Sequence, residues 1–152
     1  PGARFLFVGG GPLEGEMRAD AGPRALFLPL KGRVVPSEYY HVADVVAAPF
    51  RRDHNGRAVM PAWAAAKPAV VLRGTVPSEF IMDGANGWLV EPDPAALAVV
   101  MATAFDDPEQ AAWMGRNGRV AAETAFGWDE SARRLLAAFA RKDNLTPEAG
   151  VV

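Results

Sequence analysis

One loop of this chain gathers side chains suited to binding an anionic ligand. It follows an apolar run at residues 45–50 and reads Arg-Arg-Asp-His-Asn-Gly over residues 51–56, with an alanine-rich segment after it. The continuous apolar run predicts a strand buried on both faces, as in a parallel sheet. In an open parallel sheet, ligands bind where loops leave the carboxyl ends of the strands. We therefore expect the loop at 51–56 to form part of a binding site.

Basic residues and glycines also follow the other predicted strands. These loop residues are Gly9, Gly10 and Gly11, then Lys31 and Arg33, then Arg51, Arg52 and Arg57, and finally Arg73. The acids lie mostly in predicted helices and reverse turns instead, for example at Asp83 and Asp129. A basic rim beside glycine amides and helix N-termini favours a phosphate-bearing ligand. The alternative is that these arginines are ordinary solvated loop charges.

The motifs of several other chemistries do not match. Residues 9–15 read Gly-Gly-Gly-Pro-Leu-Glu-Gly, which misses the Gly-x-Gly-x-x-Gly spacing of dinucleotide-binding loops, and Pro12 removes an amide. The sequence has no P-loop, nucleophile elbow or metal-ligand cluster. His41 and His54 are the two histidines and cysteine is absent, so we expect no metal site. Asp53 and His54 are neighbours in a loop, where adjacent side chains rarely point together, which argues against an acid–base pair.

The composition is that of a globular protein. Half of the 152 residues are apolar, 22% are charged and the net charge is −2. This charge does not favour nucleic acid as a partner. The apolar runs are far shorter than a transmembrane segment. The absence of cysteine fits a reducing compartment, and we expect a cytoplasmic protein.

Predicted strands alternate with predicted helices until residue 90. The strands are expected at 4–8, 25–30, 45–50, 69–72 and 88–90. The helices between them are expected at 13–21, 37–43, 57–66 and 77–82, and three more follow at 94–105, 108–124 and 128–141. Short connections between alternating elements predict right-handed βαβ units and a parallel sheet. The predicted fold class is α/β, with a Rossmann-like parallel sheet flanked by helices. We assign residues 1–141 to one domain and 142–152 to a C-terminal tail.

Local signals support several of these helices. Ser37, Asp93 and Asp107 are expected N-caps, and the two aspartates are each followed by a proline at the first helical position. Gly115 and Gly118 lie inside the helix at 108–124 and weaken it by about 1 kcal/mol each. The four tryptophans and two tyrosines are expected to pack in the core or between helices rather than form a stacking surface.

Six segments together resemble one enzyme family. They read FLFVGGGPLEGEM, GRVVPSEYYHVADVVAAPF, WAAAKPAVV, VPSEFIMDGANGWLVEPDPAALA, DDPEQAAWMGRNGR and TAFGWDESARRLL. Their order is similar to that of the C-terminal half of glycosyltransferase family 4, whose members have the GT-B fold. This resemblance covers about residues 4–141. It implies that the chain binds a nucleotide-diphosphate sugar, and that a separate N-terminal domain presents the acceptor for transfer with retention of configuration.

The resemblance also implies roles for single residues. The family's signature is Glu-Gly-Phe-Gly with a second Glu eight positions after the first, and here those glutamates align with Asp53 and Pro61. Asp53 is then the candidate catalytic residue that orients the sugar. Asn55 and Gly56 bring backbone amides to the diphosphate, and Arg57 adds positive charge. Two further groups belong to this predicted site, namely Arg33 at the nucleotide base and the glycines Gly9, Gly10 and Gly11. The resemblance implies no metal or other cofactor.

Pro61 departs from the family pattern in two ways. It cannot accept hydrogen bonds from a ribose as a carboxylate can. In a helix interior it also removes one backbone bond and clashes with the carbonyl of Arg57. We therefore expect the helix to begin near Pro61 or to kink there.

The resemblance further predicts parts of the fold that precede residue 4. In this family a strand and helix come before that point, and an acceptor domain comes before them. We therefore expect the first strand–helix unit to be missing here, and the chain to be inactive without an N-terminal acceptor domain or a partner chain. Two alternatives stay open: a divergent, non-catalytic binding or assembly module, and a different Rossmann-type dinucleotide binder.

Overall fold

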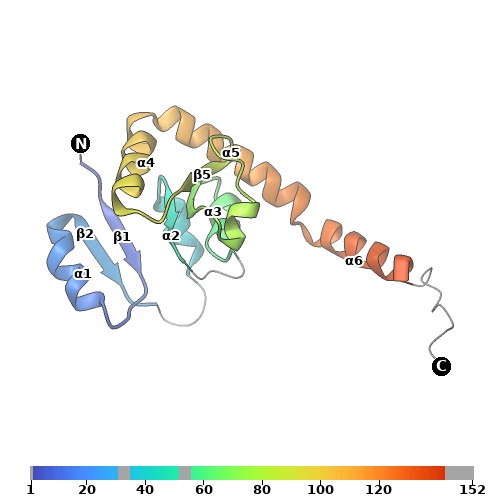
Figure 1. Ribbon diagram of the computed structural model, residues 1–152, viewed down its shortest axis with the longest axis horizontal. Coiled ribbons are helices and arrows are strands. Elements are labelled where there is room, and N and C mark those ends of the chain that lie inside the picture. The colour runs from blue at the N-terminus through green and yellow to red at the C-terminus, as the bar shows by residue number, and fades with distance from the viewer. Residues whose placement is uncertain (1, 31–34, 52–55, 143–152) are drawn as a thin grey trace, which may run out of the picture.

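The computed structural model describes residues 2–30, 35–51 and 56–142. Strands and helices alternate up to residue 90 and helices alone follow (Figure 1). The strands are β1 (Phe5–Val8), β2 (Ala25–Leu28), β3 (Val46–Ala48), β4 (Ala69–Leu72) and β5 (Gly87–Val90). The α-helices are α1 (Glu14–Ala21), α2 (Ser37–Val42), α3 (Val59–Ala64), α4 (Pro94–Asp106), α5 (Pro108–Ala125) and α6 (Trp128–Lys142). Two 3₁₀ turns are η1 (Gly22–Arg24) and η2 (Val76–Glu79).

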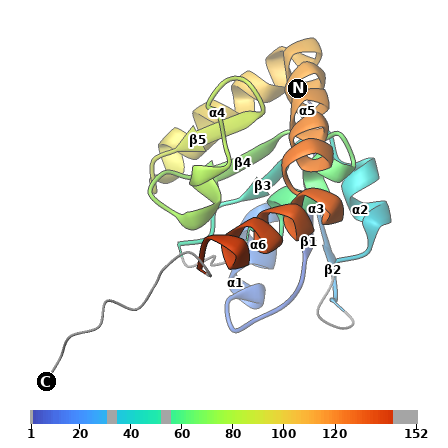
Figure 2. The ribbon, with the colours of Figure 1, turned by 90° about the vertical axis from the view of Figure 1, so that its right-hand side faces the viewer.

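All strand pairs are parallel, but the described strands form two sheets rather than one. Strands β1 and β2 make a pair, and β3, β4 and β5 make a three-stranded sheet in that order. Figure 2 shows the strands following one another as β5, β4, β3, β1 and β2. No strand pairing joins β1 to β3. The predicted α/β class, with parallel strands flanked by helices, is confirmed, and the described strands form two separate parallel sheets.

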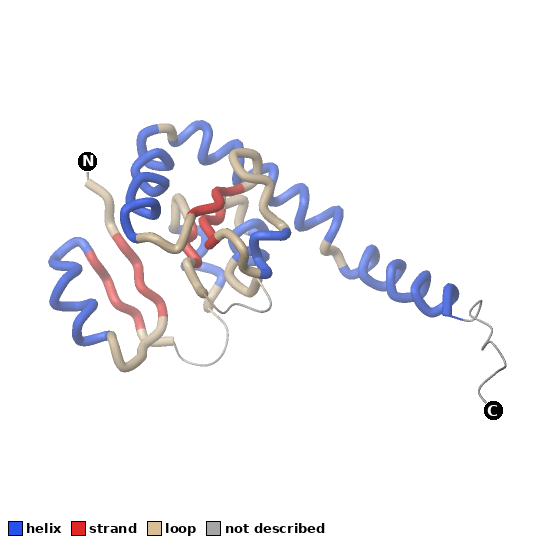
Figure 3. The backbone as a smooth tube through the Cα atoms, viewed as in Figure 1, coloured by secondary structure: helices blue, strands red, loops and turns tan. Residues whose placement is uncertain are grey.

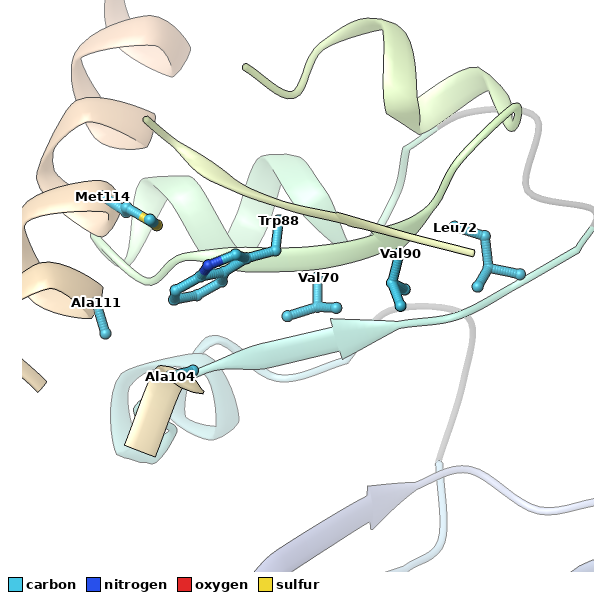
Figure 4. Packing of buried hydrophobic residues seen from close by; sticks show 7 residues of the cluster. All are labelled: Val70, Leu72, Trp88, Val90, Ala104, Ala111 and Met114. Atoms are coloured by element: carbon cyan, nitrogen blue, oxygen red, sulfur yellow. The ribbon is translucent and has the colours of Figure 1, made fainter. Parts of the chain in front are cut away.

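The core surrounds β4, which is buried along its whole length. On one face, Val70 and Leu72 pack with Trp88 of β5 and Met114 of α5 (Figure 4). On the other face, Val71 packs against α3 in a second cluster. Figure 3 shows the strands of this sheet among the surrounding helices. Successive side chains of a strand point to opposite faces, so helices on both sides explain the continuous apolar sequence of β4.

Helices α3 and α5 approach closely because α5 carries two glycines at the contact. A Cβ added at Gly118 would lie 2.2 Å from Cδ1 of Trp63, and one added at Gly115 would lie 2.1 Å from the carbonyl oxygen of Ala66. Trp63 is fully buried, and its indole N–H donates to the carbonyl oxygen of Asn86 at 2.9 Å. The two glycines therefore have a packing role that their position in the sequence did not predict.

The unit formed by β1, α1 and β2 is far less buried than the rest. None of its described residues is fully buried, and Phe5 and Leu26 are 42% and 58% exposed. Phe7 and Phe27 stack at 4.8 Å between ring centroids, and the Arg18 guanidinium lies 4.5 Å from the centre of the Phe27 ring. A two-stranded sheet is only marginally stable on its own, so this unit needs further packing contacts to be stably folded.

Two of the three predicted N-caps are confirmed. Asp93 accepts a hydrogen bond from the amide of Ala96 at 2.8 Å, and Asp107 accepts one from the amide of Gln110 at 2.9 Å. Ser37 instead is the first residue of α2, after Pro36, and makes no side-chain cap. The proline before Ser37 already turns the chain into the helix, so the cap position falls one residue earlier than predicted.

Helix α6 extends away from the body of the protein (Figure 1). Its residues 131–140 are all exposed, including Leu135, Leu136 and Phe139 of its apolar face. Trp128 is 91% exposed and Trp113 is 46% exposed, so the core prediction is wrong for these two tryptophans and right for Trp63 and Trp88. No described helix is both long and apolar enough to cross a membrane.

The α3–α5 contact predicts opposite effects for two glycine-to-alanine changes. Gly118→Ala should lower the free energy of unfolding by about 2–3 kcal/mol, because overpacking at Trp63 outweighs the gain in helix propensity. Gly15→Ala in α1 should raise it by up to about 1 kcal/mol, because open space surrounds that position. Urea unfolding followed by circular dichroism measures both. A stabilising Gly118→Ala would contradict the packing argument.

Candidate functional site

The loops at the carboxyl ends of β1, β3, β4 and β5 form the candidate site. Arrows of β1 and β3 run in the same direction in Figure 4, so their following loops lie toward the same end of the protein. Of the predicted site residues, Gly9, Gly10, Gly11, Gly56 and Arg57 lie in the described part of the chain. Asp53, Asn55 and Arg33 lie outside the described residues, as do Lys31, Arg52 and His54.

Gly56 forms the turn that opens helix α3. Its φ of +59° is one that side-chain-bearing residues rarely adopt. Its carbonyl oxygen accepts hydrogen bonds from the amides of Val59 at 2.9 Å and Met60 at 3.2 Å. A Cβ at this position would lie 3.2 Å from Cε2 of Phe80, which is tighter than ordinary contact. Gly56 is buried, whereas the neighbouring Arg57 is exposed and available to a ligand.

Pro61 sits in the first turn of α3, which begins at Val59. The amides of the first helical residues have no partner inside a helix, so the missing N–H of Pro61 costs no backbone bond there. Its carbonyl oxygen accepts from the amide of Ala65 at 3.0 Å, as in a regular helix. The prediction that the helix begins near Pro61 is therefore confirmed, and it begins two residues before the proline.

Phe80 reaches Gly56 from the segment between β4 and β5. Asn86, which is 1% exposed, anchors that segment: its side-chain oxygen accepts from the amide of Met82 at 2.8 Å, and its amide group donates to the carbonyl of Phe80 at 3.3 Å. The Phe80 ring in turn meets the Phe126 ring edge-to-face. Sequence reasoning missed all three residues, because no periodicity or motif connects positions so far apart.

The glycines after β1 form a second turn at this edge. The Gly9 amide donates to the carbonyl of Leu28 at 2.9 Å, and Gly9 has a φ of +129°. The carbonyl of Gly11 accepts from the amide of Glu14, which opens α1. The Glu14 carboxylate lies beside Gly10 and pairs with Arg18 at 2.8 Å. An anion at this turn must therefore displace or accommodate a carboxylate.

Arg73, which follows β4, is already paired. Its guanidinium contacts Asp83 at 3.0 Å and Glu91 at 3.1 Å. Asp83 also accepts from the amide of Leu89 at 2.9 Å, so the acid is fixed in place. The predicted segregation of acids away from the basic rim is wrong here, since folding brings two carboxylates to this arginine. Within the described chain, the exposed arginines of the rim are Arg51, Arg57 and Arg73, and Arg73 is held by two carboxylates.

The described edge suits a ligand held by backbone amides and a small number of arginines. Among the residues that the structure describes, no group of three or more histidines or acids is placed to hold a metal ion. The phenol of Tyr40, whose pKa is raised by burial, packs against α3 in a cluster with Ala62 and Ala65 and is part of the support of that helix.

Comparison with known proteins defines the class. The family model described as glycosyl transferases group 1 matches residues 1–107. The chain belongs to this glycosyl transferases group 1 family. A curated relative, D-inositol 3-phosphate glycosyltransferase of Xylanimonas cellulosilytica, is 32% identical over 112 residues, which cover 73% of this chain and 27% of the relative. The chain thus spans about a quarter of the length of that curated relative.

Two solved structures show the same fold. Sucrose-phosphate synthase from Thermosynechococcus elongatus superposes with a TM-score of 0.77 at 23% identity, covering 93% of this chain and 39% of that one. Anabaena HepE in complex with UDP-glucose superposes with a TM-score of 0.75 at 20% identity, covering 90% and 40%. This likeness in fold confirms the predicted fold class.

The conformation of Gly56 predicts a specific sensitivity. Gly56→Ala should lower the free energy of unfolding by about 1–2 kcal/mol, the cost of placing a Cβ in the left-handed region. Gly11→Ala, a change at an exposed turn with open space around it, should alter it by less than about 0.5 kcal/mol. Thermal and urea unfolding measure the difference, and equal effects of the two changes would contradict it.

Proposed function

We propose that this chain is the donor-binding half of a retaining glycosyltransferase of family 4 that uses a nucleotide-diphosphate sugar. The observation that carries the proposal is the left-handed turn at Gly56, which opens α3 at the carboxyl end of β3 in a chain of the glycosyl transferases group 1 family. A glycine there lets the chain backbone approach a diphosphate closely.

Each candidate residue has a chemical role in this proposal. Asp53 accepts hydrogen bonds from sugar hydroxyl groups and orients the sugar. Backbone amides at Asn55 and Gly56 approach the diphosphate, and exposed Arg57 adds a positive charge. Arg33 borders the nucleotide base. The glycines after β1 supply further backbone donors.

The reaction breaks the bond between the anomeric carbon and the diphosphate oxygen. Positive charge then develops on the sugar and negative charge on the departing diphosphate. Arginine and backbone amides stabilise the diphosphate, and no protein nucleophile or metal is assigned to the step. The acceptor hydroxyl oxygen bonds to the anomeric carbon on the face that the diphosphate leaves, and its proton passes to the departing diphosphate, so configuration is retained.

The acceptor is held by a domain outside these 152 residues, so the chain alone should not turn over. The described strands follow one another as β2, β1, β3, β4 and β5, and β1 does not pair with β3. The doubly-wound order 3-2-1-4-5-6 gives this arrangement when its strand 1 is left out. The unpaired edges of β1 and β3 therefore support a missing structural unit between them. A parallel strand in that gap would pair with both open edges and cover the exposed residues of β1. We propose that the polypeptide preceding residue 1 supplies it.

A second candidate function is a non-catalytic binding or assembly module of the same fold. Pro61 favours it, because proline stands where the family pattern has a second carboxylate. The two functions differ in one respect that can be measured: turnover that depends on Asp53.

Calorimetry tests the donor-binding proposal. The full-length protein, titrated with UDP-, GDP- and ADP-sugars, should bind one class, and Asp53→Ala should weaken sugar-dependent binding and reduce turnover by about 10²-fold or more. Thermal stabilisation by NAD or NADP, with none by nucleotide sugars, would instead indicate a dinucleotide binder. Binding without any turnover would favour the non-catalytic module.

Engineered cysteines test the missing strand, since the chain has none of its own. With a strand between β1 and β3, positions 6 and 47 lie about 9.6 Å apart, two strand spacings, which is too far for a disulfide. We therefore expect no disulfide to form in two double variants of the full-length protein, Leu6→Cys with Ala47→Cys and Phe7→Cys with Ala47→Cys. Leu6→Cys with Leu26→Cys, which are in register, should form a bridge. Rapid disulfide formation across β1 and β3 would overturn the proposal.

A further inference from the structure

We propose that Phe126, at the corner between α5 and α6, is a positioning residue for the Gly56 turn and acts on it through Phe80. This inference rests on the proposed function, because it assigns Phe126 an effect on donor binding. Phe126 lies 70 positions after Gly56 in the sequence, and no motif links the two.

The contacts form a continuous path from the corner to the turn. The Phe126 ring meets the Phe80 ring edge-to-face, with centroids 5.2 Å apart and planes at 77°. The Phe80 ring edge lies against Gly56, where an added Cβ would be only 3.2 Å from Cε2. An edge-to-face pair fixes the orientation of each ring as well as its distance.

The backbone and the ring of Phe80 are held by different groups. Asn86 accepts from the amide of Met82 and donates to the carbonyl of Phe80, so it anchors the backbone of this segment. The ring has a contact of its own, the edge-to-face pair with Phe126. Phe126 itself packs on Trp63 with centroids 6.4 Å apart, so the path ends on a fully buried side chain of α3.

Because Phe126 is partly exposed, an effect of its truncation on the Gly56 turn can be distinguished from an effect on core packing. Its side chain is 39% exposed, whereas Trp63 is fully buried. Truncating a partly exposed ring removes less buried area than truncating a fully buried one, so it should affect overall stability less than truncation in the core. The Phe80 ring, once unsupported, can rotate away from Gly56 and leave the turn less ordered. Donor binding should then suffer more than stability.

Four variants of the full-length protein test this inference. Phe126→Ala removes the support, Phe126→Tyr keeps the ring, and Phe126→Leu keeps apolar bulk without an aromatic edge. Phe105→Ala is the matched control, because Phe105 is a half-buried aromatic residue that lines a separate pocket with Asp44, Lys67 and Pro68. Donor affinity is measured by calorimetry with the UDP-, GDP- or ADP-sugar that the wild-type protein binds. Amide hydrogen exchange over residues 56–60 is measured in the absence of ligand.

Phe126→Ala should weaken donor binding about tenfold and speed exchange at residues 56–60, since small displacements of a binding group carry costs of this order or larger. Phe126→Tyr should restore both, Phe126→Leu should restore them in part, and Phe105→Ala should leave both unchanged. Wild-type affinity and exchange in Phe126→Ala would overturn the inference, as would equal losses in Phe105→Ala. If the wild-type protein binds no nucleotide sugar, the proposed function fails, while exchange at residues 56–60 still decides whether Phe126 orders the turn.

Discussion

The close contact between Trp63 and Gly118 is the constraint on which the described part of this structure depends. The indole occupies the volume that a side chain at position 118 would need, so it packs directly on the backbone of α5 there. The indole N–H also donates to the carbonyl of Asn86, which ties the segment before β5 to the same two helices. One side chain therefore connects α3, α5 and the segment between β4 and β5.

This contact determines how the candidate site is built. Helix α3 begins at Val59, directly after the Gly56 turn, so whatever fixes α3 also fixes the turn. Asn86 anchors the segment that carries Phe80, and the Phe80 ring closes over Gly56. The turn thus rests on buried groups on two sides, while Arg57 beside it stays exposed. This is the arrangement expected of a binding turn, with rigid backbone donors and an accessible charge.

Helix α3 accommodates a proline at position 61 without losing a backbone hydrogen bond. Pro61 lies in the first turn of α3, where its missing amide has no intrahelical partner. Pro61 therefore does not disturb the fold, and its consequence in the proposed function is limited to ligand chemistry. Arg73 differs, since it keeps its positive charge but already pairs with the carboxylates of Asp83 and Glu91. In the proposed function, donor recognition then depends more on backbone amides and exposed arginines than on paired carboxylates.

The sequence by itself determined the class of fold and most of its elements, because those follow from local signals. Strand β4 was predicted at the bounds it has, and the caps at Asp93 and Asp107 follow from an acceptor side chain placed before a proline. The Gly56 turn was singled out from the family pattern, and the roles assigned to Asp53, Asn55 and Arg33 remain predictions.

Only the tertiary structure decided which distant residues meet. It divided the described strands into two sheets, placed Asp83 and Glu91 on Arg73, left Trp113 and Trp128 exposed, and brought Phe126 to Phe80. Local sequence patterns indicate how residues a few positions apart are arranged. These contacts instead join residues that are far apart in the sequence, and no repeating pattern links their positions. Their physical cause is packing, in which the absence of a side chain at Gly118 matters as much as the indole that fills its place.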